Sequence, residues 1–93
     1  MIIADRPLTP LGFAGVLGVV GVVKLPSTPV SAAYAYIQAD GGDLRWRDDG
    51  TDPTSSVGML IMDGEDLWYT GDLHTIRFIA VTTANLHVSY YKP

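Results

Sequence analysis

The side chains best suited to chemistry gather between residues 44 and 59, where a short strand-like stretch leads into a loop rich in aspartate. Asp48, Asp49 and Asp52 offer carboxylate oxygens, the ligands that calcium prefers. An EF-hand loop, however, places acidic residues at alternate positions before its glycine and a bidentate glutamate after it. Here the glycine comes too early and no such glutamate follows. The pattern favours a turn whose aspartates accept bonds from local N–H groups, with a bound cation as the alternative.

Two arginines precede this loop. Arg45 and Arg47 lie two positions apart, so an extended chain places both on one face. Beside Asp48 and Asp49 they predict an ion-pair network at a surface or a subunit interface. Because an exposed ion pair contributes only about 0–1 kcal/mol, such a network would matter more for register between subunits than for stability. We therefore predict these four residues as interface residues.

No catalytic constellation is visible in the sequence. His74 and His87 have no second histidine, cysteine or carboxylate at a metal-ligand spacing. An oxygenase of cupin-like shape would need two histidines and a carboxylate around iron. Serines and threonines cluster at residues 54–56, but outside a Gly-x-Ser-x-Gly elbow and without an apparent base. We predict a protein that is not an enzyme, with no catalytic residue, no metal and no cofactor.

The size and charge of the chain further limit the class of protein that it can belong to. A chain of 93 residues forms one small domain, and such a domain gains from further burial against a partner. It has no cysteine, so no disulfide supports the fold. Ten acidic residues against six basic ones give a net charge of −4, which excludes the basic footprint of a nucleic-acid-binding protein.

The N-terminal part is apolar and rich in glycine. Residues 11–23 lack the flanks of a secretory signal and are too few for a membrane-spanning helix, so we expect a strand or an extended arm and no membrane contact. We divide the chain into an arm with the first strand, residues 1–25, and a β-sandwich domain, residues 26–93. Ile2 and Ile3 are predicted to dock on a neighbouring subunit.

Short runs of β-branched and aromatic residues alternate with turn signals along the rest of the chain. The spacing predicts an all-β, single-domain antiparallel β-sandwich of jelly-roll type, or a small barrel, with an extended N-terminal arm. The expected strands are 16–25, 30–39, 44–47, 57–62, 65–69, 75–82 and 86–91.

Alternation within these strands separates their two faces. In the strand 30–39, small side chains suited to tight packing alternate with Tyr34 and Tyr36, which suit a surface or a subunit contact. Trp46 is expected in the core beside Phe78, and Trp68 is expected to be the more exposed tryptophan. We predict Tyr34, Tyr36 and Trp68 as further interface residues.

The region from Val30 to Tyr91 resembles small β-sandwich structural proteins of tailed bacteriophages and prophages. The most distinctive piece is Leu-Arg-Trp-Arg-Asp-Asp-Gly-Thr-Asp-Pro-Thr at residues 44–54. The other matching pieces are Tyr-Ala-Tyr-Ile-Gln-Ala-Asp-Gly (34–41), Val-Gly-Met (57–59), Gly-Asp-Leu (71–73), Ile-Arg-Phe-Ile (76–79) and Leu-His-Val-Ser-Tyr-Tyr (86–91). The resemblance covers about two thirds of the chain.

This resemblance implies a non-catalytic virion protein, made in the host cytoplasm and placed on the capsid surface. The expected role is a capsid decoration or cement protein, a homotrimer that clamps neighbouring subunits of the major capsid protein. The alternative is a tail-associated module that binds carbohydrate or a receptor. That module would use Tyr34, Tyr36, Trp68 and Tyr69 as one exposed aromatic platform.

Overall fold

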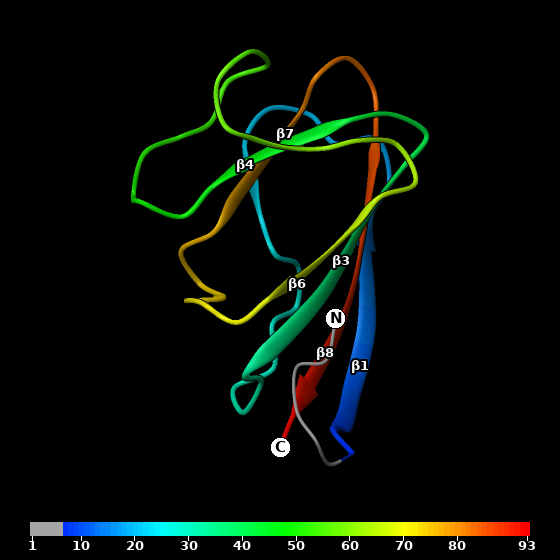
Figure 1. The fold of residues 1–93 in the computed structure, drawn as a ribbon, viewed down its shortest axis with the longest axis vertical. Helices are drawn as coiled ribbons and strands as arrows, with labels where there is room; N and C mark the ends of the chain where they lie inside the picture. The colour runs from blue at the N-terminus through cyan, green and yellow to red at the C-terminus, as the bar shows by residue number, and fades with distance from the viewer. Residues whose placement is uncertain (1–6) are drawn as a thin grey trace.

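The computed structural model describes residues 7–93 and consists of strands and loops, with no helix among those residues (Figure 1). The predicted contact residues Ile2 and Ile3 lie outside the described part of the chain. The strands are β1 (Thr9–Val16), β2 (Val23–Lys24), β3 (Tyr34–Asp40), β4 (Leu44–Arg47), β5 (Met59–Ile61), β6 (Asp66–Tyr69), β7 (Arg77–Ala80) and β8 (Asn85–Lys92).

The eight strands form two antiparallel four-stranded sheets, in the orders β1-β8-β3-β6 and β2-β7-β4-β5. The two sheets pack as an open sandwich, not as a closed barrel. Apart from the β4–β5 hairpin, each strand is followed by a strand of the other sheet, and the first strand pairs with the last, the second with the seventh, and the third with the sixth. This is the strand order of a jelly roll, as the sequence predicted.

The core lies between the two sheets and follows the predicted alternation. Every second residue of β3 points inward, so Ala35, Ile37 and Ala39 are fully buried. Their small side chains let the sheets approach closely around the larger core residues. The largest fully buried side chains are Tyr90, Phe78, Ile37, Leu44, Ile76, Leu86, Val88 and Pro53.

The N-terminal strands differ from the prediction. A single strand over residues 16–25 was expected, but the chain forms β1 over Thr9–Val16, turns, and forms only the two-residue β2. Gly18 and Gly21 explain the difference, since their φ angles of 66° and 65° lie in the left-handed region and interrupt an extended chain. Both strands belong to the sandwich, because β1 pairs with β8 and β2 with β7.

The two tryptophans lie in different sheets. Trp46 pairs with Phe78 across β4 and β7 and packs against the core, as expected, although it stays partly exposed. Trp68 pairs with Tyr36 on the outer face of the other sheet and is also partly exposed. Its environment is therefore a neighbouring aromatic side chain, not the core.

Candidate functional site

The aspartate-rich loop between β4 and β5 is tied to the sheet by arginines. Arg45 Nη1 donates to the carbonyl oxygen of Gly58 at 2.9 Å and its Nε to that of Ser55 at 3.2 Å. Arg77, from β7, donates through Nη1 to Asp52 Oδ1 at 2.8 Å. Because these contacts reach both halves of the loop, they hold it against β4 and β7.

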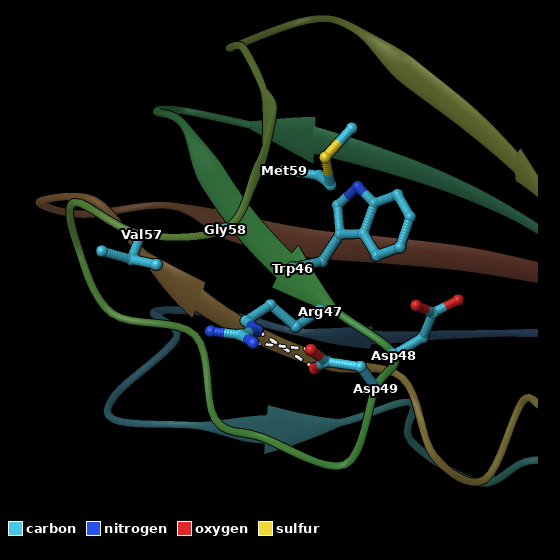
Figure 2. Close-up of a pocket in the computed structure, with 7 residues that line it drawn as sticks. All are labelled: Trp46, Arg47, Asp48, Asp49, Val57, Gly58 and Met59. Carbon is cyan, nitrogen blue, oxygen red and sulfur yellow. Dashed lines mark hydrogen bonds and ion pairs between the residues drawn. The ribbon is translucent and has the colours of Figure 1, made fainter.

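Arg47 is the third arginine that contacts this loop. Its Nε lies 3.0 Å from Asp49 Oδ1 and its Nη2 2.5 Å from Asp49 Oδ2, a bidentate pair drawn in Figure 2. The hydrogen bonds from Arg47 lower the pKa of Asp49 to about 2. Both side chains remain at the surface, so the pair shapes the turn more than it stabilises the fold.

Asp48 points away from this ion pair, toward the other sheet. It accepts a hydrogen bond of 2.8 Å from the hydroxyl of Tyr69, the last residue of β6. Burial, and then the bond to Asp48, raise the pKa of Tyr69 to about 12. The ring of Tyr69 meets Trp46 edge to face, with centroids 5.9 Å apart. This contact joins the two sheets at the margin of the core.

A hollow of about 530 Å³ opens beside these groups. Figure 2 shows the indole of Trp46 and the thioether of Met59 side by side above the Arg47–Asp49 pair, with Val57 farther along the loop. Two of these lining side chains, Val57 and Met59, are large, apolar and exposed. The hollow is thus an apolar surface with a charged rim.

The three loop aspartates are held by different partners. Asp48 accepts from Tyr69, Asp49 pairs with Arg47, and Asp52 pairs with Arg77. This arrangement favours the turn over the cation cup. Among residues 7–93, no three side chains of histidine, cysteine, aspartate or glutamate come together in a group that could hold a metal ion.

The two histidines take part in local polar contacts. The backbone N–H of His74 donates to Asp72 Oδ1 in the turn before β7. His87 lies on β8, with Nε2 3.3 Å from Asp40 Oδ2. Its ring stacks against Phe13 of β1, with centroids 5.7 Å apart.

Three of the predicted aromatic residues share the outer face of the sheet that contains β1. Tyr34 and Tyr36 come from β3, and Trp68 comes from β6. Tyr36 and Trp68 have centroids 4.7 Å apart, and Trp68 and Tyr91 have centroids 5.4 Å apart. Tyr69, the fourth residue of the predicted platform, is buried instead, because successive residues of a strand point to opposite faces.

The structure adds side chains to this face that were not among the predicted interface residues. Tyr91 and His87 belong to it because β8 pairs with β3 in a register that places Tyr91 opposite Tyr34 and His87 opposite Gln38. Their alternation along β8 is visible in the sequence. The pairing partner is not, because β3 and β8 lie about half the chain apart.

No protein-family model, curated protein or solved structure matches this chain. No helix within residues 7–93 has the length and apolar character needed to cross a membrane.

Proposed function

We propose that this chain is a non-enzymatic structural subunit of a bacteriophage particle. In this proposal it is a decoration or cement protein on the capsid surface, a homotrimer that stabilises contacts between major capsid subunits. The observation that carries the proposal is an apolar flank on the loop that follows β1, beside the outer edge of that strand. We define the apolar flank as the exposed side chains Leu17, Val20 and Val22.

The apolar flank is unusual for a surface. Residues 7–23 contain no charged side chain. Leu17 and Val20 are 77% and 86% exposed, although burying a side chain of this size is worth about 1.5–3 kcal/mol. Scattered apolar residues are normal on protein surfaces, whereas a concentrated group indicates a contact site. A neighbouring subunit would remove this apolar area from water.

Among the described strands, β1 is also the edge of its sheet (Figure 1). Edge strands are usually protected by being short or by carrying charges. β2 and β5 have two and three residues, and β6 has four and begins with Asp66. β1 has eight residues and no charge, with Pro10 and a bulge near its start as its protection. Within residues 7–93 no strand pairs with its outer edge, and such an edge suits strand addition by a neighbour, in which backbone hydrogen bonds supply affinity.

The fold is consistent with the proposal. Jelly rolls are common in viral capsid proteins, but also in lectins and in cupins. Fold alone therefore does not decide function. The proposal is supported mainly by the apolar flank and the edge of β1, together with the resemblance in residues 44–54.

The alternative, a tail-associated carbohydrate- or receptor-binding module, needs ring faces that are open to a ligand. Tyr34, Tyr36 and Trp68 do share one face, which favours it in part. However, Trp68 packs between Tyr36 and Tyr91, so these rings cover part of one another. Tyr69 is buried. The decoration role is the better supported of the two.

Reconstitution on particles tests the proposal. Particles made without this gene would be mixed with purified protein, sedimented and heated. We expect the protein to sediment with the particles and to raise the temperature at which they release DNA. The double variant Leu17→Lys/Val20→Lys should lose binding, because it places charge on the apolar flank. Val30→Lys, at a fully exposed position in another loop, is the matched control and should bind normally.

Failure of the unmodified protein to sediment with particles would contradict the proposal. Equal binding by the double variant and the control would contradict the role of the apolar flank. Light scattering after size exclusion gives the copy number, and a monomer at high concentration would contradict the homotrimer.

A further inference from the structure

The outer face of the β1-β8-β3-β6 sheet contains a gap between two aromatic side chains. The strand registers place Phe13 of β1, Ser89 of β8 and Tyr36 of β3 in one row across the sheet. Ser89 is small, so the row is open at its centre. A hollow of about 220 Å³ lies there, also lined by Gln38 and His87. We call this hollow the aromatic slot.

The spacing of the strands leaves room for one ring between β1 and β3. Neighbouring strands are about 4.8 Å apart, so the backbones of β1 and β3 are separated by about 9.6 Å across β8. A ring held between two others needs about 7–8 Å, twice the carbon–carbon contact distance of 3.5–4.0 Å. The hollow is smaller than the roughly 300–1,000 Å³ of sites for drug-sized ligands. It has room for a single ring, not for a peptide segment.

The polar side chains that line the aromatic slot determine which kind of ring could bind there. The side chains of Gln38 and Ser89 make no hydrogen bond to any residue in the described part of the chain, so an amide and a hydroxyl remain for a ligand. The ring of His87 already has two partners: it stacks against Phe13, and it lies near the carboxylate of Asp40. Aromatic walls with uncommitted polar groups beside them fit a ligand that has both C–H faces and hydroxyl groups.

The charge around the aromatic slot further limits the kinds of ligand that could bind there. Carboxylates stand at the border of the aromatic slot: Asp40 lies next to His87, and Asp66 accepts a hydrogen bond from the hydroxyl of Tyr36. The chain as a whole has a net charge of −4. An anionic ligand would be repelled, because like charges near one another are unfavourable. An uncharged ring meets no such repulsion.

We propose that the aromatic slot binds one ring of a neutral saccharide, held between Phe13 and Tyr36, with Gln38 and Ser89 bonding to its hydroxyl groups. This goes beyond the structural role proposed above and does not depend on it. A single particle subunit with such a site would bind neutral glycans weakly. Many copies on one particle would raise the avidity of the particle for a glycan surface.

Nuclear magnetic resonance of the ¹⁵N-labelled protein tests this inference. The probes are methyl β-D-glucoside, methyl β-D-galactoside, chitotriose and cellotriose, with sialyllactose as the anionic comparison and phenol as the aromatic one. We expect at least one neutral probe to shift the amide signals of residues 13, 36–38 and 87–89, with a dissociation constant in the millimolar range for a single ring. Sialyllactose and phenol should cause smaller shifts.

Two variants locate the binding. Ser89→Leu fills the aromatic slot and should abolish the shifts, and Phe13→Ala removes one wall and should weaken binding about tenfold. Leu17→Ala changes an exposed apolar residue that does not line the slot and should bind normally. An unchanged spectrum elsewhere would show that each variant is folded.

Three outcomes would overturn the inference: no shift with any neutral probe, binding that survives Ser89→Leu, or stronger binding of sialyllactose or phenol. Each is separable from failure of the proposed virion role. Ser89→Leu leaves the apolar flank intact, so its sedimentation with particles measures that role independently.

Discussion

The contact between the β3–β4 turn and the β7–β8 turn predicts a large effect for Gly42→Ala. A Cβ atom on Gly42 would lie 1.7 Å from the carbonyl oxygen and 2.9 Å from the carbonyl carbon of Thr83. Real Cβ contacts essentially never fall below 3.0 Å, and the obstacle is backbone, not a flexible side chain. The two turns must therefore move apart by about 1 Å or more.

Several stabilising contacts involve these two turns. Val81 N–H donates to the carbonyl oxygen of Asp43 at 3.0 Å, and Asp63 N–H donates to Asp43 Oδ1 at 2.8 Å. Ala84, next to Thr83, is buried. With about 1 kcal/mol for each hydrogen bond and further loss of packing around Ala84, we expect Gly42→Ala to destabilise the protein by about 3–5 kcal/mol. That is a large part of the roughly 5–14 kcal/mol expected for a domain of this size.

Gly64→Ala is the matched control. Gly64 has a φ of 84° in another turn, but a Cβ there would meet nothing within 4 Å. The control should lose only the left-handed backbone preference, about 1 kcal/mol. Urea unfolding followed by tryptophan fluorescence measures both variants. A difference below about 1 kcal/mol between them would refute the close approach of the two turns.

Three further predictions concern the loop between β4 and β5 and its contacts. Arg45→Met should destabilise the protein by about 1–2 kcal/mol and speed proteolysis within the loop, because it removes two bonds to loop carbonyls. Arg47→Ala should change stability less than Arg45→Met does in thermal unfolding, since its pair with Asp49 lies at the surface, and the reverse order of the two variants would contradict the geometry. Tyr69 has a pKa of about 12 against an ordinary value of 10.0, so the folded protein keeps a proton that the unfolded chain loses. The contribution of this proton to folding stability is complete below pH 10 and falls as the pH rises from 10 to 12. Tyr69→Phe should therefore lose less stability than the unmodified protein between pH 10 and 12. Equal losses in the two proteins would argue against the buried hydroxyl.

Period-two alternation was sufficient to predict much of the fold. In β3 and β8 the apolar and polar faces separate cleanly, and Ile37 and Val88 are buried as alternation requires. The N-terminal strands were misplaced because glycine, unlike a β-branched residue, permits both strand and left-handed backbone. Val-rich sequence around Gly18 and Gly21 gave no indication of which would form.

The candidate site was only partly predictable. The aspartates and arginines of residues 44–59 were recognised from their spacing. Arg77 and Tyr69, which bind Asp52 and Asp48, come from strands more than twenty residues away. Such partners follow from strand register, which no local pattern determines. The same limit concealed the row that forms the aromatic slot.

Electron cryo-microscopy of intact particles from the host that carries this gene tests the central proposal most directly. We expect density for an eight-stranded jelly roll on the outer surface of the head, in threefold groups, with the edge of β1 and the apolar flank against a neighbouring subunit. Particles whose head lattice is complete without this protein, with the chain absent from their protein content, would contradict it.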